Sequence, residues 1–172
     1  SRGLGDVYKR QYYDPVKAHE YYEKHKKLKG RHSTTGMTNS QKEMAAYVKD
    51  KLSAEKKQKL ESVTKKARGQ RADVTAAAKA KREMFAKSCS NIITSLRTKL
   101  QNMNPDQKKF ARQRIQEEIS KVRETYAKRK AGVTSDAKNQ RNSISASAKT
   151  EKANIRTDYN NKYAEALSLI HI

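Results

Sequence analysis

The stretch "NMNPDQ", Asn102 to Gln107, decides the fold because it is the strongest break in a long helix-forming sequence. Asn104 is a good N-cap, and Pro105 suits the first position of a helix. Asn102 can take the left-handed conformation that commonly ends a helix. The stretch therefore predicts a tight turn at 103–105, between two long helical segments that we call the arms.

Both arms are rich in Ala, Lys, Glu, Gln and Arg, which are good helix formers. We expect the first arm to span 40–102 and the second to span 106–166, and neither contains a proline. Two alternative capping boxes mark the beginning of the first arm: Ser40 with Glu43, or Thr38 with Gln41.

Mostly apolar residues recur every eleven positions, in two rows along each arm. Eleven residues make three turns at about 3.67 residues per turn, so each row stays on one side of a nearly straight helix. Strands have a period of two, and a disordered chain has no period. The first rows are Leu52, Val63, Val74, Phe85 and Leu96, and Ala111, Val122, Val133, Ile144, Ile155 and Ala166. The second rows are Ala45, Lys56, Ala67, Ala78, Cys89 and Leu100, and Ile115, Tyr126, Ala137, Ala148 and Tyr159.

The rows of the two arms match when the chain folds back at the turn. The numbers of paired first-row residues add up to 207, as for Phe85 with Val122, and those of second-row residues to 204, as for Ala78 with Tyr126. The predicted fold is therefore all-α: a long antiparallel two-helix coiled-coil hairpin with an eleven-residue repeat, preceded by a short helix. Such a repeat also permits slipped registers, and only the short turn selects this one.

The predicted seam between the arms is thin. Its third row is mostly charged, and Gly69 and Gly132 each cost about 1 kcal/mol relative to Ala. We expect a marginally stable hairpin that gains stability from a partner or from homo-oligomerisation. The charged third-row residues are Arg71 and Arg82 in the first arm, and Lys130, Arg141 and Lys152 in the second.

Charge is the main chemical feature of the chain. Of the 172 residues 34% are charged, the formal net charge is +22, and only 34% are hydrophobic. Such a surface would attract phosphate backbones without reading sequence. The alternatives are a solvated face that keeps the helices soluble and a surface that binds an acidic protein partner. Candidate nucleic-acid contacts lie in the dense basic runs: Lys56, Lys57, Lys65, Lys66, Arg68, Arg71, Lys79, Lys81, Arg82, Lys128, Arg129 and Lys130.

A short tyrosine-rich helix is predicted at 12–30, followed by a polar linker at 31–39. Asp14 is its N-cap candidate, Pro15 its first residue, and Gly30 follows its end. This helix either packs back onto the open end of the hairpin or docks on another protein, because tyrosines are favoured at interfaces. The docking candidates are Tyr12, Tyr13, Tyr21, Tyr22 and Leu28.

No catalytic, cofactor or metal site is recognisable. "HEYYEKH" lacks the second histidine of a zinc-protease helix, since position 23 is Glu23, and His19 and His25 face different sides. Cys89, the one cysteine, falls in a seam row and has no disulfide partner. No run approaches the ~20 apolar residues of a membrane span. We therefore expect a protein that is not an enzyme and does not bind a membrane.

The stretch "YYDPVKAHEYYEKHKKLKGR" at 12–31 resembles the beginning of small, charged, helical proteins of phages and prophages of Gram-positive gut bacteria. The resemblance implies a structural or assembly role with a capsid-type protein partner, in the host cytoplasm or the virion. The surplus of lysine and arginine leaves a DNA-associated role open. Both ends, 1–11 and 167–172, resemble translated sequencing-adapter DNA, so we expect them to lie outside the natural fold.

Overall fold

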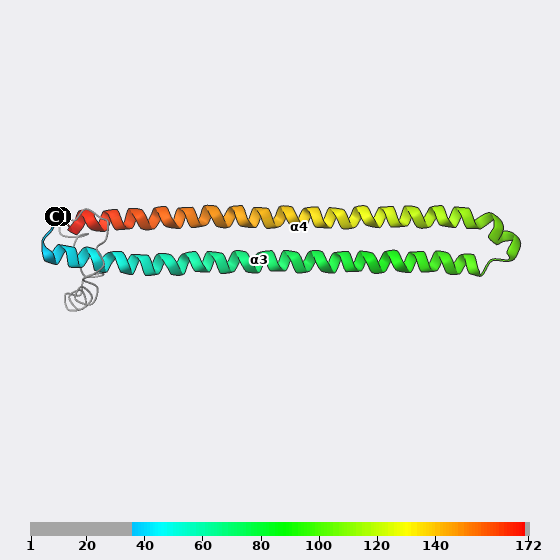
Figure 1. The fold of residues 1–172 in the computed structure, drawn as a ribbon, viewed down its shortest axis with the longest axis horizontal. Helices are drawn as coiled ribbons and strands as arrows, with labels where there is room; N and C mark the ends of the chain where they lie inside the picture. Colours follow the sequence, from blue (N-terminus) through cyan, green and yellow to red (C-terminus); the bar gives the residue numbers. More distant parts are fainter. Residues whose placement is uncertain (1–35, 171–172) are drawn as a thin grey trace. The chain divides into compact units, whose positions relative to one another are not determined.

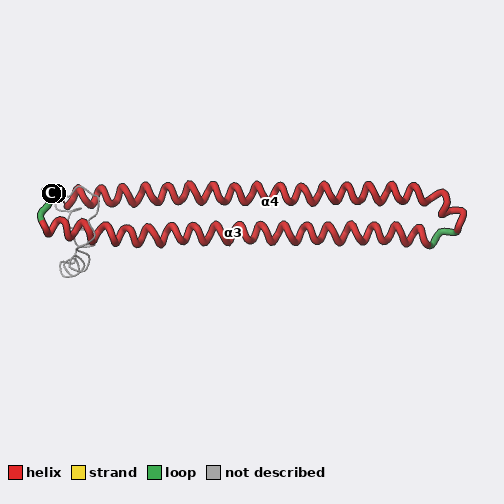
Figure 2. Tube along the Cα trace, in the orientation of Figure 1, coloured by secondary structure: helices red, strands yellow, loops and turns green. Residues whose placement is uncertain are grey.

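The computed structural model describes residues 36–170, which form an all-α helical hairpin (Figure 1). Helix α3 spans Asn39–Gln101 and helix α4 spans Pro105–Ile170. The remaining described residues are loop or turn, and the part of the chain that is described contains no strand (Figure 2). The predicted fold class is confirmed for the hairpin, whereas the helix predicted at 12–30 lies outside the described residues.

A capping box begins α3, and it is one of the two predicted pairs. The Thr38 backbone N–H donates to Gln41 Oε1 at 2.8 Å, and the Gln41 N–H donates to Thr38 Oγ1 at 3.3 Å. These reciprocal bonds satisfy backbone groups that the first helical turn leaves free. The helix accordingly begins at Asn39, one residue before the predicted beginning of the arm.

The turn is capped as predicted at the beginning of α4 but not at the end of α3. Asn104 Oδ1 accepts a bond from the Gln107 N–H at 2.9 Å, and Pro105 is the first residue of α4. The prediction of a left-handed Asn102 is wrong, because Gly36 alone among the described residues has a positive φ. Instead, α3 ends by tightening: the Met103 N–H donates to the Leu100 carbonyl, three residues back, at 3.4 Å.

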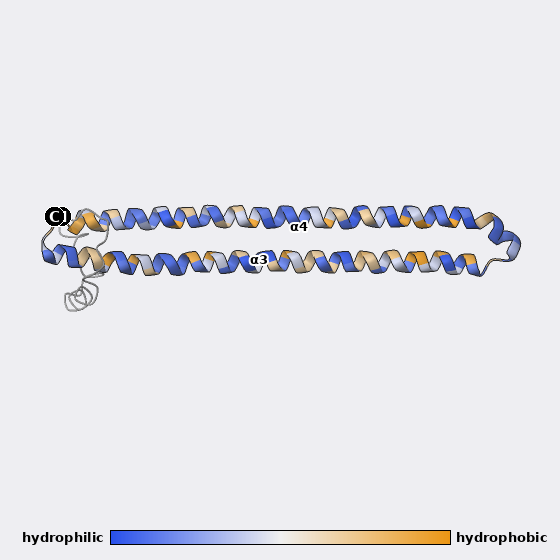
Figure 3. Ribbon diagram, viewed as in Figure 1, coloured by the Kyte–Doolittle hydropathy of each residue, from blue (hydrophilic) through white to orange (hydrophobic). Residues whose placement is uncertain are grey.

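The eleven-residue rows form the seam. Every residue of the four predicted rows is buried or half-buried, Lys56 and Cys89 included. The charged third row is also half-buried, except Arg71, which is exposed. Hydropathy coloured on the ribbon shows apolar residues as separated bands on otherwise polar helices (Figure 3). The described helices therefore bury a narrow apolar line, as the spacing predicts.

The structure divides into two compact units, and the open end of the hairpin belongs to the first. In its described part this unit comprises 36–65 and 148–170. Tyr159, which is 3% exposed, lies in its apolar core, and its hydroxyl lies 3.4 Å from Glu55 Oε2. The buried core residues are Met37, Ala45, Val48, Leu52, Tyr159, Ala166 and Ile170, with Met44, Tyr47, Ile155, Tyr163 and Leu167 packed against them.

Helix α4 continues past the predicted end of the second arm at 166. Leu167 packs against the core of this unit, Ile170 is 8% exposed, and the Ile170 carbonyl accepts a bond from Gln41 Nε2 at 2.8 Å. Residues 167–170 are therefore part of α4 in this chain, whereas the adapter-like origin expected for them stays a prediction. The apolar side chains of this last turn fall on the core side of an existing helix, where burial stabilises them.

The second unit, 66–147, contains the turn and fixes the register of the hairpin. The rings of Phe85 and Tyr126 meet edge to face, with centroids 6.2 Å apart. Their numbers add up to 211, so this contact lies one helical turn away from the predicted pairing of Phe85 with Val122. The first turns of α4 bend where the chain crosses between the helices (Figure 1). Because this crossing uses residues of α4, the midpoint of the hairpin lies beyond Asn104.

Candidate nucleic-acid interface

Two arginines, one in the third seam row of each helix, show that the third rows of the second unit lie on a common side of the seam. Arg71 Nη1 of α3 donates to Ser145 Oγ at 3.4 Å, and Arg141 Nη1 of α4 donates to Thr75 Oγ1 at 3.2 Å. Each hydroxyl lies four residues after the arginine of its own helix. Because each third row thus bonds to the other helix, both third rows lie on the same side of the seam.

Steps of four residues from the third row lead around this same side of each helix. A step of four turns an α-helix by about 40° beyond one full turn, away from the seam. In α3 this leads from Arg71 through Thr75 to Lys79, and in α4 from Lys130 through Thr134 to Lys138. We call the resulting surface the basic face. This surface does not include the bent first turns of α4. The cations of the basic face are Arg68, Arg71, Lys79, Arg82, Arg97, Arg123, Lys130, Lys138 and Arg141.

Carboxylates are missing from the rows of the basic face. The second unit contains 20 Lys and Arg residues and 7 Asp and Glu residues, and none of the seven falls in these rows. On the other side of the seam, Glu118 and Asp136 accompany Arg114 and Arg129. The basic face is therefore the most uniformly positive surface that the second unit offers.

Few cations of the basic face are neutralised by an ion pair. Lys79 Nζ lies 4.0 Å from Glu83 Oε1, with side chains that are 74% and 67% exposed. Such a pair is weak in water. Arg71 and Arg141 bond to neutral hydroxyls, which leaves their charges uncompensated. The potential of neighbouring cations adds up on such a surface and attracts anions.

The structure brings five of the predicted nucleic-acid contacts together and separates the others. Lys66, Lys81 and Arg129 belong to the opposite side of the seam, where Arg129 lies over the Tyr126 ring with its Cζ 5.1 Å from the centroid. Lys128 is on the outer surface of α4 and pairs with Glu124 at 2.7 Å. Lys56, Lys57 and Lys65 belong to the first unit. The five on the basic face are Arg68, Arg71, Lys79, Arg82 and Lys130.

Four cations of the basic face were missed because they stand alone in the sequence. A search for dense basic runs finds neighbours along the chain, whereas a helix surface collects residues that are three, four or eleven apart. The eleven-residue rows contained the necessary signal, since Lys130 and Arg141 are already one repeat apart. The missed residues are Arg97, Arg123, Lys138 and Arg141.

The predicted docking tyrosines at 12–30 lie outside the described residues. Their predicted packing site near Ala45, Tyr159 and Tyr163 is part of the core of the first unit. Desolvation by burial raises the pKa of the Tyr163 hydroxyl above its ordinary value of 10.0. The open end of the hairpin is thus an apolar environment, unlike the basic face.

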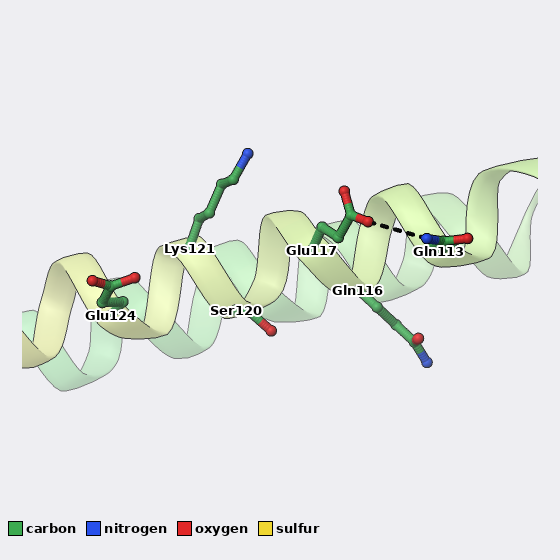
Figure 4. A pocket seen from close by; sticks show the side chains of 6 residues that line it. All are labelled: Gln113, Gln116, Glu117, Ser120, Lys121 and Glu124. Atoms are coloured by element: carbon green, nitrogen blue, oxygen red, sulfur yellow. Dashed lines mark hydrogen bonds between the residues drawn. The ribbon is translucent and has the colours of Figure 1, made fainter.

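Other chemistry is sparse in the described part of the chain. Cys89 is a free, half-buried thiol of the seam. Within 36–170, no three His, Cys, Asp or Glu residues gather as metal ligands, and no helix is long and apolar enough to cross a membrane. One shallow depression lies on the outer surface of α4, among the exposed side chains of residues 113–124, with Gln113 Nε2 bonded to Glu117 Oε1 at 3.3 Å (Figure 4).

No protein-family model, curated protein or solved structure matches this chain. The candidate site therefore rests on the geometry and charge of the hairpin alone.

Proposed function

We propose that this protein is a non-enzymatic helical hairpin that binds nucleic acid through its basic face, without reading sequence. The observation that supports this most is the segregation of charge: nine cations share a side of the second unit whose rows hold no carboxylate. A surface that served only solubility would not need its few carboxylates to be kept off one side. Lys and Arg side chains bind phosphates and release condensed counterions, which gives salt-dependent affinity.

The rows of the basic face carry no means of reading bases. In the second unit they contain no aromatic side chain: Phe85 and Tyr126 are half-buried in the seam, and Phe110, which is 84% exposed, falls in none of these rows. The described chain has no recognition helix that stands free of the hairpin to enter a groove. Contacts to phosphates position a protein on a duplex but carry no sequence information. The proposed binding is therefore independent of sequence.

The proposal is tested by two charge-reversed proteins with the same net charge. One carries Arg123→Glu and Lys138→Glu on the basic face, and the control carries Lys87→Glu and Lys121→Glu on outer surfaces. We expect duplex DNA to bind the wild type and the control, with affinity falling about 10³-fold or more between ~50 and ~200 mM salt. The face variant should bind at least tenfold more weakly than the control. Equal losses in both variants, or no salt dependence, would contradict the proposal.

A structural or assembly role with a protein partner is a second proposal, carried by the apolar open end of the hairpin. Met37, which lies in the predicted linker at 31–39, is part of the apolar core of the first unit. Capture of a capsid-type partner by the full chain should be lost with Tyr21→Ala and Tyr22→Ala together. Unchanged capture by this variant would exclude docking through the tyrosines. A phage-encoded role is compatible with either surface.

A further inference from the structure

Seven of the nine cations of the basic face fall into two groups that repeat along the hairpin, and Arg97 and Arg123 belong to neither group. Three pairs of these cations stand eleven residues apart: Arg68 and Lys79, Arg71 and Arg82, and Lys130 and Arg141. Since eleven residues make three helical turns, the members of each pair lie on one side of their helix. The first group is Arg68, Arg71, Lys138 and Arg141, and the second is Lys79, Arg82 and Lys130.

Contacts across the seam place each group at one level of the hairpin. In the first group, the bonds of Arg71 to Ser145 and of Arg141 to Thr75 hold the two helices side by side. In the second group, Arg82 lies three residues before Phe85 and Lys130 four residues after Tyr126, whose rings are in contact. Each group therefore joins cations of both helices at one level.

The spacing of the two groups is close to the average spacing of backbones along duplex DNA. Eleven residues of α-helix rise about 16.5 Å. One turn of the duplex is about 34 Å long and contains two strands, so a line parallel to its axis crosses two backbones per turn, alternately over the narrower minor and the wider major groove, about 17 Å apart on average. We propose that the basic face binds duplex DNA laid along the hairpin, with each group on one backbone crossing. This inference rests on the proposed function and names its ligand.

Duplex DNA fits the basic face better than a single strand does. Single-strand binders combine positive charge with aromatic platforms on which bases stack. The rows of the basic face in the second unit contain no aromatic residue, so they offer only phosphate contacts. A duplex presents more phosphate charge per length than a single strand, and each neutralised phosphate changes the salt slope by about 0.9 rather than about 0.7. The duplex should therefore bind more tightly.

The first experiment compares the full chain on two probes of equal length, a duplex of about 24 base pairs and a single strand of about 24 thymidines, at ~100 mM salt. We expect the duplex to bind at least tenfold more tightly, as measured by fluorescence anisotropy. Equal or tighter binding of the single strand would overturn the inference and leave the proposed function standing. Failure of both probes to bind would overturn both.

A second experiment removes one group at a time. Arg68→Gln with Lys138→Gln depletes the first group, and Arg82→Gln with Lys130→Gln depletes the second. Each double variant should lower the salt slope for the duplex by about 2. The control, Lys87→Gln with Lys121→Gln on outer surfaces, should leave the slope within about 0.5 of the wild type. A slope that depends on only one of the groups would contradict binding across two backbone crossings. Circular dichroism checks that each variant keeps its helix content.

Discussion

Arg71 and Arg141 reach across the seam in opposite directions and end on equivalent hydroxyls. Arg71 Nη1 lies 3.4 Å from Ser145 Oγ, and Arg141 Nη1 lies 3.2 Å from Thr75 Oγ1. Each hydroxyl also donates to the carbonyl of the arginine on its own helix, at 2.8 Å for Thr75 and 2.9 Å for Ser145. Each hydroxyl thus accepts a hydrogen bond from the arginine of the other helix and donates one to a carbonyl of its own helix. In this way the seam accommodates two like charges.

Removing these two hydroxyls should destabilise the second unit. Thr75→Ala with Ser145→Ala deletes both acceptors, and a hydrogen bond of this kind contributes about 0.5–1.5 kcal/mol. Because both bonds are exposed, we expect the double variant to lose about 1 kcal/mol relative to the control below in urea unfolding, a comparison in which the higher helix propensity of alanine cancels. The control is Thr64→Ala with Thr157→Ala, whose hydroxyls donate only to carbonyls of their own helices. Equal losses in both proteins would show that the cross-helix bonds contribute nothing.

The register can be tested with engineered disulfides. Val74 lies eleven residues before Phe85, and Ala137 lies eleven residues after Tyr126, so this pair has the observed register. Val74 and Val133 instead form a pair in the register predicted from the turn. In a Cys89→Ala background, Val74→Cys with Ala137→Cys should oxidise within a monomer faster than Val74→Cys with Val133→Cys. Disulfide formation requires Cα atoms about 4.4–6.8 Å apart. The opposite order of rates would restore the predicted register.

The sequence predicted the seam well because its signal is local and repeated. Every seam row recurs along each arm, so single exceptions such as Lys56 do not hide the period. The register was missed by one turn because an eleven-residue repeat gives several pairings similar burial, and the length of the crossing decides among them. The basic face was found only in part, since Arg141 and Lys138 become neighbours of Arg71 only when the helices pack.

Gly69 and Gly132 should be replaceable by alanine with a gain in stability. A Cβ at either position meets no atom within 4 Å, and neither has a positive φ. Glycine in a helix interior costs about 0.8–1.0 kcal/mol relative to alanine. Each substitution should therefore raise the free energy of unfolding by roughly 0.5–1 kcal/mol in urea titrations. Gly36→Ala is the matched control, because Gly36 has a φ of +87° and should lose stability instead. A lower free energy of unfolding for Gly69→Ala would contradict a straight helix with free space around this position.

The two asparagines of the turn should differ in their response to alanine. Asn104 caps α4 through its side chain, so Asn104→Ala should cost about 0.5–2 kcal/mol of stability. Asn102 has no positive φ, so Asn102→Ala should change stability by less than about 0.5 kcal/mol. Chemical denaturation of the two single variants measures both values. A large loss at Asn102 would instead support the left-handed residue that the sequence suggested.

Tyr163 should make the first unit sensitive to alkaline pH. Burial raises the pKa of its hydroxyl in the folded state above the ordinary value of 10.0. A raised pKa means that the folded state favours the neutral phenol, so this contribution to stability is fully present below pH ~10 and is lost as pH rises through the folded pKa. Tyr163→Phe removes this dependence, while lysines titrate alike in both proteins. We expect the difference in unfolding free energy between Tyr163→Phe and the wild type to be constant from about pH 7 to 9. Above pH ~10 the variant should become more stable relative to the wild type. A difference that stays constant throughout would show that the phenol titrates equally in the folded and unfolded states.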